Sequence, residues 1–213
     1  MTCMLVNLVL LNLLLLQRPD QNKTPREVQR ENTPTRELLN WFEGEGSDVL
    51  IRRGEAAFDD FAEILSDNKA EVKHVERTFS ILCNIKADRS RFHDLTLARL
   101  GDRRSDIRRE AVRFLAHIGS EGDTAPVAVL LLDGETMVRY AAAKTLAAIG
   151  GKRDLIVFDL IIRDADRHLD RDGKPVLNGH NVKHYTSCRE TLEKRLKDAE
   201  AKDVPKAPAV EKK

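Results

Sequence analysis

The side chains with the clearest chemical meaning in this 213-residue sequence are cationic and aromatic, and they recur at a fixed spacing. They are Arg109, Arg113, Tyr140 and Lys144. Residues 140 and 144 follow residues 109 and 113 by the same 31 positions, so we expect all four to project from equivalent places on two similar helices. Arginine and aromatic residues are enriched among those that dominate binding energy at protein interfaces. We predict that the four form a partner-binding surface; the alternative is a solvated ridge, partly neutralised by Glu110 and Glu135.

A polar segment at residues 164–182 contains the side chains best suited to a metal ion. His180 and His184 lie four residues apart, as zinc ligands on one helical face do, and His168 or an aspartate would be a third ligand. The aspartates before Gly173 do not complete a calcium loop, because the first and last ligand positions of that loop lack a carboxylate. We therefore predict a solvated polar loop with no metal and no cofactor, and a histidine site is the alternative.

Recognisable catalytic motifs are absent from the sequence. It has no glycine-rich phosphate loop, no Ser-His-Asp or Cys-His arrangement in a familiar context, and no pair of carboxylates expected in a cleft. Cys3, Cys83 and Cys188 fit neither a disulfide framework nor a zinc site, so we expect buried or inert thiols. We predict that the protein is not an enzyme.

The elements that must present the cationic surface are two near-copies of one amphipathic helix. The first copy contains Ile107, Arg108, Ala111, Leu115, Ile118 and Gly119, and the second contains Val138, Arg139, Ala142, Leu146, Ile149 and Gly150. We expect Ser105 to cap the first helix through its hydroxyl, and Gly119 to end it in a left-handed conformation. A shorter apolar segment closed by Asp102 or Asp133 precedes each copy, so the repeating unit is helix, turn, helix. Such a pair cannot bury its apolar stripe alone, which predicts a stack.

This pattern of aspartate, Val-Arg or Ile-Arg, alanine, leucine and Ile-Gly resembles the HEAT and HEAT-like repeats, most clearly over residues 93–164. The resemblance implies an all-α solenoid of about four stacked helix pairs. It also implies that four residues are structural and tie adjacent repeats together; these are Asp102, Arg108, Asp133 and Arg139. In this family the second helix of each pair usually lines the concave surface. The fold does not define a function, because HEAT repeats occur in many unrelated proteins.

The expected organisation places the solenoid at residues 34–198. Its parts are a short helix at 37–44 that ends the stack with Trp41, a degenerate pair at 56–85, the clear repeats 93–119 and 123–150, the insert 164–182 and a closing helix. A polar linker at 17–33 precedes the solenoid, and a disordered tail at 199–213 follows it.

Residues 1–16 form an apolar, signal-like segment. The run from Cys3 to Leu16 is too short for a typical membrane span and has the length of the apolar part of an export signal. However, no lysine or arginine precedes it, and no small-residue cleavage site follows it. Three alternatives stay open: an export signal leading to the periplasm or cell envelope, a short membrane anchor, and a packed segment of a cytoplasmic protein. Membrane contact is expected only through residues 3–16, if they are uncleaved.

The balance of charge disfavours an anionic partner surface such as DNA. The sequence contains 36 Lys and Arg residues against 35 Asp and Glu residues, for a formal net charge of +1. We predict a non-enzymatic scaffold that binds a partner protein of unknown identity through its concave helix face. The resemblance leaves two alternatives: a nucleic-acid-binding protein of the repair type, and a lyase or accessory protein that acts on a protein-bound cofactor.

Overall fold

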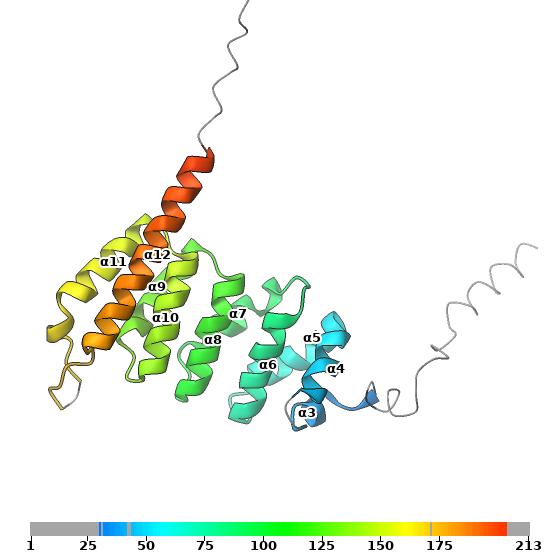
Figure 1. Cartoon of the computed structure of the whole chain (residues 1–213). Coiled ribbons are helices and arrows are strands. Elements are labelled where there is room, and N and C mark those ends of the chain that lie inside the picture. The colour runs from blue at the N-terminus through cyan, green and yellow to red at the C-terminus, as the bar shows by residue number, and fades with distance from the viewer. Residues whose placement is uncertain (1–29, 31, 42–43, 171, 204–213) are drawn as a thin grey trace, which may run out of the picture.

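A computed structural model describes residues 30, 32–41, 44–170 and 172–203, and it consists of stacked helix pairs (Figure 1). The first helices of the pairs are α3 (Thr35–Leu38), α5 (Phe58–Ser66), α7 (His93–Arg99), α9 (Thr124–Val129) and α11 (Lys152–Arg163). The second helices are α4 (Glu45–Arg53), α6 (Val72–Asn84), α8 (Ser105–Ile118), α10 (Thr136–Ile149) and α12 (Gly179–Asp203). Short 3-10 turns join them: Gly54–Ala57, Ser90–Phe92, Glu121–Asp123, Leu130–Leu132 and Ala165–Arg167. The prediction of an all-α solenoid is confirmed.

The second helices pack on one another in sequence, α6 on α8, α8 on α10 and α10 on α12, and this stacking creates one continuous apolar core. Each fully buried large side chain stabilises the fold by about 1.5–3 kcal/mol relative to an exposed one. The buried aromatic residues are distributed along the whole stack: Phe58, Phe61, Phe79, Phe92, Phe114, Phe158 and Tyr185. A polar contact adds to the packing, because the Thr145 hydroxyl donates to the Val112 carbonyl at 2.7 Å, between α8 and α10.

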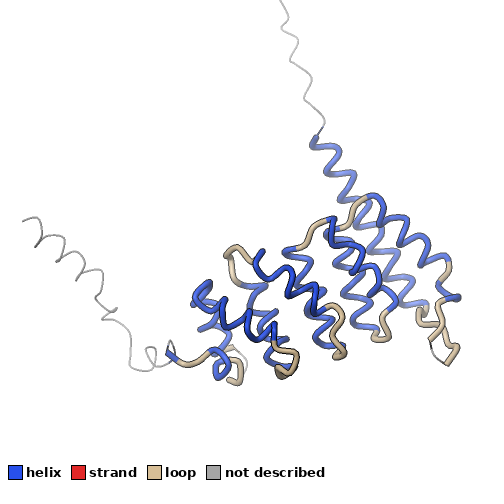
Figure 2. Tube along the Cα trace, turned by 180° about the vertical axis from the view of Figure 1, so that it is seen from behind, coloured by secondary structure: helices blue, strands red, loops and turns tan. Residues whose placement is uncertain are grey.

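The 31-residue period is reproduced in the helix bounds. α8 spans Ser105–Ile118 and α10 spans Thr136–Ile149, so both ends move by the same number of residues. Within the described part of the chain there is no β-strand (Figure 2). The only strand-like feature there is an isolated antiparallel pairing of Leu169 with Pro175.

The helix starts differ from the expected serine cap. The Ser105 hydroxyl makes no capping hydrogen bond, and Arg104 occupies the cap position, so that prediction is wrong. Instead, the Asp102 carboxylate accepts a hydrogen bond from the backbone N–H of Arg104 at 3.0 Å. Asp133 does the same for the N–H of Glu135 at 2.8 Å. The aspartate of the turn therefore organises the start of each second helix.

The glycines that end these helices are required for space and not for a left-handed backbone. Gly119 has φ −79° and Gly150 has φ −69°, both in the extended region, so the predicted left-handed conformation is wrong. A Cβ on Gly119 would lie 2.6 Å from the Leu115 carbonyl oxygen, and one on Gly150 would collide with the Leu146 carbonyl oxygen. The chain therefore folds back too tightly at these points for any side chain.

The N-terminal end of the stack contains a helix that the sequence did not predict. One helix was expected at residues 37–44; the structure has the single turn α3 and then α4, which packs against α6. Gly46 lets α4 cross close to α3, since a Cβ there would overlap the Leu38 carbonyl oxygen. Trp41 is partly buried against the core, at the place expected of a terminal cap.

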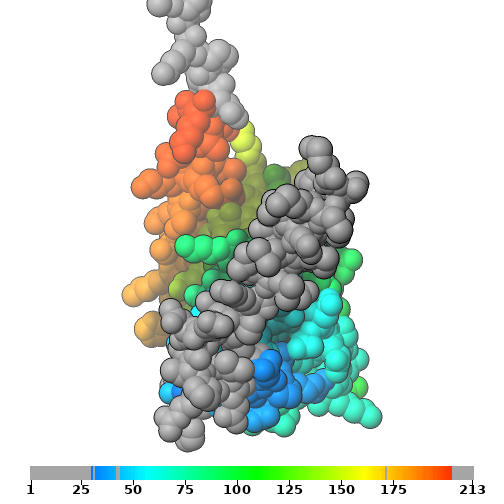
Figure 3. Space-filling view, turned by 90° about the vertical axis from the view of Figure 1, so that its right-hand side faces the viewer, coloured from blue at the N-terminus to red at the C-terminus, as the bar shows by residue number. Residues whose placement is uncertain are grey.

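The C-terminal helix continues past the expected boundary at residue 198. α12 extends to Asp203, and its last turns are exposed and project beyond the rest of the stack (Figure 3). The signal-like segment 1–16 with Cys3, most of the linker 17–33 and residues 204–213 lie outside the described residues. Among the helices of the described part, none is both long and apolar enough to cross a membrane.

Candidate partner-binding groove

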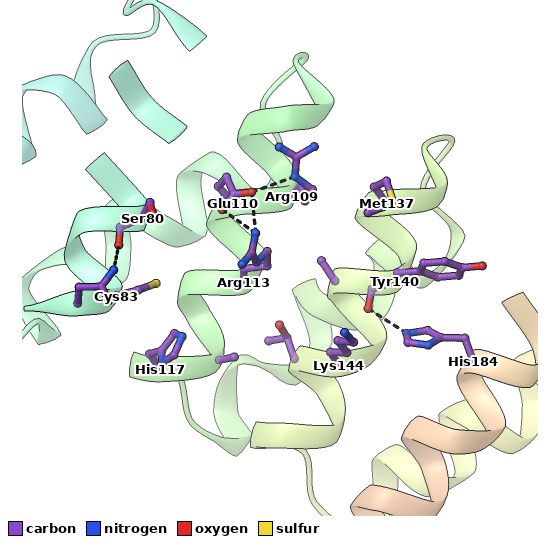
Figure 4. Close-up of a pocket in the computed structure, with 14 residues that line it drawn as sticks. Ser80, Cys83, Arg109, Glu110, Arg113, His117, Met137, Tyr140, Lys144 and His184 are labelled. Carbon is purple, nitrogen blue, oxygen red and sulfur yellow. Dashed lines mark hydrogen bonds and ion pairs between the residues drawn. The ribbon is translucent and has the colours of Figure 1, made fainter. Parts of the chain in front are cut away.

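The four residues predicted to bind a partner line a single groove (Figure 4). It lies across α6, α8, α10 and the start of α12 and has a volume of about 840 Å³. Its lining residues are Ser80, Cys83, Asn84, Arg109, Glu110, Arg113, Ala116, His117, Met137, Tyr140, Ala141, Lys144, Thr145 and His184. The groove therefore lies on the face formed by the second helices, and the residues that share the 31-residue spacing face it from neighbouring helices.

Arg109 is fully occupied by carboxylates of the protein itself. Its Nε donates to Glu110 at 2.9 Å, its Nη1 to Asp106 at 2.7 Å and its Nη2 to Glu76 at 2.8 Å. The hydrogen bond to Glu110 contributes most to raising the pKa of the guanidinium, and the negative charges of Glu110, Asp106 and Glu76 raise it further. Burial raises the pKa of Glu76, and the neighbouring carboxylates raise it further. Arg109 therefore joins α6 to α8 rather than offering free charge. Glu135, one of the two expected neutralising residues, does not line the groove.

Arg113 and Lys144 are the more available cations of the groove. Arg113 has a side chain that is 63% exposed, and its Nη1 contacts only Glu110, at 3.1 and 3.3 Å. Glu110 is shared with Arg109, so it compensates Arg113 incompletely. Lys144 is exposed, and its ammonium group forms no ion pair with the described residues. Both side chains can therefore accept an additional anionic partner.

Tyr140 is held in place by His184, a residue that the sequence suggested only as a metal ligand. The centroids of the two rings lie 4.5 Å apart, and His184 Nε2 donates to the Tyr140 carbonyl oxygen at 3.3 Å. The Cys188 thiol lies 3.6 Å from the same nitrogen, but burial raises its pKa to about 11. This thiol therefore stays protonated at neutral pH, and the Cys-His contact is not a nucleophilic pair.

Met137 is the lining residue that sequence reasoning missed most clearly. Its side chain is 58% exposed at the edge of the groove, beside Tyr140 (Figure 4). His117 and Cys83 were also missed as lining residues. The available signal was the helical spacing from Met137 to Tyr140 and Lys144, which places all three on one face of α10.

The structure places Arg108 and Asp133 in direct contact across the boundary between the two clear repeats. Arg108 Nε and Nη2 donate to the two carboxylate oxygens of Asp133, both at 2.8 Å. Its Nη1 donates to the Asp102 carbonyl at 2.8 Å, within its own turn. Arg139 repeats the second contact one period later, donating to the Asp133 carbonyl at 2.7 Å.

Asp102 pairs with two arginines that are close to it in the sequence, Arg99 and Arg104. Arg104 donates to both of its carboxylate oxygens at 2.9 Å, and Arg99 donates at 3.0 Å. Arg99 Nε also reaches the Leu65 carbonyl at 2.8 Å, and Arg104 Nη1 reaches the Ala70 carbonyl at 2.7 Å. Asp102 is therefore linked to the preceding helix pair through these two side chains.

The insert does not assemble the predicted alternative metal site. Among the described residues, no group of three or more His, Cys, Asp or Glu side chains is placed to hold a metal ion. His180 is exposed at the start of α12, and His184 faces Tyr140. The insert contains a tight hairpin in which Val176 N–H donates to the His168 carbonyl at 2.7 Å. Leu177 is buried, so the insert is not solvated throughout.

Cys83 and Cys188 are both free, Cys83 partly buried and Cys188 buried. Burial raises the pKa of the Cys83 thiol as well. Both observations agree with the expectation of buried or inert thiols, whose reactivity stays a prediction, and Cys3 lies outside the described residues.

Comparison with known proteins gives a family match for the segment that forms most of the groove. The family model described as HEAT repeats matches residues 94–172, from α7 to the insert. Residues 94–172 contain HEAT repeats. No curated protein and no solved structure gave a significant match. The HEAT repeats supply α8 and α10, and with them the four predicted binding residues. They support a helical interaction scaffold and do not define its partner.

Proposed function

We propose that this HEAT-repeat protein is a non-enzymatic scaffold whose groove binds a segment of a partner protein. The observation that carries the proposal is the convergence of Arg109, Arg113, Tyr140 and Lys144 on one groove. Open grooves that combine a few cations with aromatic and thioether side chains have the residue types found at the centre of protein interfaces.

The charges of the groove favour a protein partner over DNA. DNA-binding surfaces gain much of their affinity from lysine and arginine side chains that replace phosphate counterions. Arg109 instead contacts three carboxylates, and Glu110 also pairs with Arg113. The face thus alternates between cation and anion. A partner protein can match such a pattern with its own charges, whereas a polyphosphate backbone cannot.

Charge reversal at the two available cations tests the proposal. The double variant Arg113→Glu/Lys144→Glu of the full chain should lose capture of its partner from lysate of the source cells by at least tenfold. Neither residue contributes to the core, so helicity by circular dichroism should be unchanged. Arg109 is unsuitable for this test, because its loss would leave Glu76 and Asp106 without their cation.

A matched control is available on the same molecule. Arg153 and Lys174 are exposed, lie outside the groove and provide the same pair of residue types. The variant Arg153→Glu/Lys174→Glu should capture the partner as the native protein does. Equal capture by the native protein and the groove variant would discard the groove as the binding surface. Salt-sensitive binding of duplex DNA by the native protein would favour the nucleic-acid alternative instead.

A further inference from the structure

We infer that the groove recognises an acidic protein segment that carries a bulky apolar side chain next to its carboxylates. This inference rests on the proposed function and specifies the chemistry of the partner. It is based on an uneven distribution of charge and apolar surface within the groove.

Charge compensation is concentrated at one end of the groove. Arg109 lies near the start of α8 and has all three of its guanidinium nitrogens bonded to carboxylates. Arg113, one turn further along α8, shares only Glu110. Lys144, at the equivalent place on α10, has no carboxylate partner among the described residues. The unsatisfied positive charge therefore lies on α8 and α10 within one groove, where carboxylates of the partner can pair with these two side chains.

The apolar part of the groove lies beside this cationic centre. Met137 is 58% exposed one turn before Tyr140 on α10, and the His184 ring supports Tyr140 from α12. Ala116 and Ala141 line the groove with small side chains and leave space. Thioether and aromatic groups contact aromatic and large aliphatic side chains favourably. A bulky apolar residue of the partner is therefore the natural complement at this end.

The longer undescribed segments of this chain are either uncharged or carry an excess of positive charge. Residues 204–213 contain three lysines and one glutamate, residues 17–29 contain three basic and two acidic side chains, and residues 3–16 contain no charged side chain. None of these segments offers the excess of carboxylates that would complement Arg113 and Lys144. The complementary segment therefore belongs to another protein.

The probe for this inference is a random peptide library displayed on phage and selected on the immobilised full chain. Selected peptides should be enriched in Asp or Glu next to a large apolar residue. A synthetic consensus peptide should bind the variant Arg113→Glu/Lys144→Glu at least tenfold more weakly than the native protein. The control variant Arg153→Glu/Lys174→Glu should bind it as the native protein does.

The outcomes separate this inference from the proposed function. Peptides that depend on Arg113 and Lys144 but are not acidic would overturn the inference and leave the proposed function standing. Peptides unaffected by the groove variant, or a failure to enrich any sequence, would overturn the inference and also count against the groove. The variant Met137→Ser should lower the preference for the apolar residue while retaining the preference for acid. Retention of both preferences would show that Met137 does not contact the peptide. It would overturn the inference that the groove recognises a bulky apolar side chain.

Discussion

Arg108 and Asp133 form a two-point ion pair that joins the turn of one repeat to the helix of the repeat before it. Both N–O distances are 2.8 Å, and the two side chains are 16% and 7% exposed. The planar guanidinium matches the carboxylate at two points, a geometry that lysine cannot reproduce. This pair therefore fixes the relative position of α8 and the turn before α10.

The first prediction concerns this ion pair. Arg108→Lys should lower the free energy of unfolding by about 2–4 kcal/mol, because it leaves Asp133 partly unpaired in a buried position. Urea denaturation at neutral pH measures the change. Arg113→Lys, at an exposed position on the same helix, is the control and should change stability by less than about 0.5 kcal/mol. Equal effects of the two substitutions would show that the two-point geometry contributes nothing.

The second prediction concerns Arg139, which occupies the position of Arg108 one repeat later. Arg139 is buried, but its Nη2 faces the neutral amide oxygen of Asn181 at 3.4 Å, and its Nε has no partner among the described residues. The amide nitrogen of Asn181 is also buried without a partner there. Asn181→Asp replaces that unsatisfied donor with a carboxylate and creates an ion pair near the start of α12. We expect an increase in stability of about 1 kcal/mol.

Thermal unfolding of the Asn181→Asp variant at neutral pH measures this effect. The increase should disappear below about pH 3, where the new carboxylate is protonated. A loss of stability at neutral pH would mean that desolvation of the carboxylate exceeds its attraction to Arg139.

The third prediction concerns the crowded glycines. Gly119→Ala should destabilise the protein by about 1–3 kcal/mol, because the new methyl group would lie 2.6 Å from the Leu115 carbonyl oxygen. Gly134→Ala is the control, since a Cβ at that position meets nothing within 4 Å. Chemical denaturation of the pair should show a large effect for Gly119 and nearly none for Gly134. Similar values for both would contradict the steric explanation.

The fourth prediction concerns acid stability. The hydrogen bonds from Arg104 lower the pKa of Asp102 from 3.8 to about 2 in the folded protein. Because the folded-state pKa is the lower one, the stabilisation is fully present above about pH 4 and is lost as the pH falls towards 2. The ionised carboxylate should contribute roughly 2 kcal/mol at neutral pH.

The stability difference between the native protein and Asp102→Asn should therefore shrink between pH 5 and pH 2. Urea midpoints collected across this range test it, and a difference that stays constant with pH would refute the assignment. The difference is the useful quantity, because other carboxylates titrate in the same range and affect both proteins equally.

The regular part of the fold was predictable because one period encodes it. The apolar positions from Ile107 to Ile118 recur after 31 residues, and the structure repeats the helix bounds by the same amount. The shared position of the four binding residues followed from that spacing, since equivalent residues on adjacent helices of a stack face the same way. Their part in partner binding stays a prediction.

The remaining features of the fold and of the groove could not be predicted from the repeat, because they depend on contacts between segments that are distant in the sequence. Glu76 neutralises Arg109 from α6, 33 positions away, and no local pattern indicates this. The short helix α4 has few apolar residues and is stabilised largely by its packing on α3 and α6. The role of Gly119 was misjudged because a glycine after a helix is usually explained by its backbone freedom, whereas here the neighbouring carbonyl excludes a side chain.

The identical lengths of α8 and α10 have a consequence for how this architecture can change size. Residues 105–135 make up one 31-residue module, which ends one position before α10 begins. A tandem duplication of that module would preserve the register and would lengthen the array by one helix pair. It would also add a second copy of Arg109 and of Arg113. The groove of such a longer protein would therefore extend over one more helix.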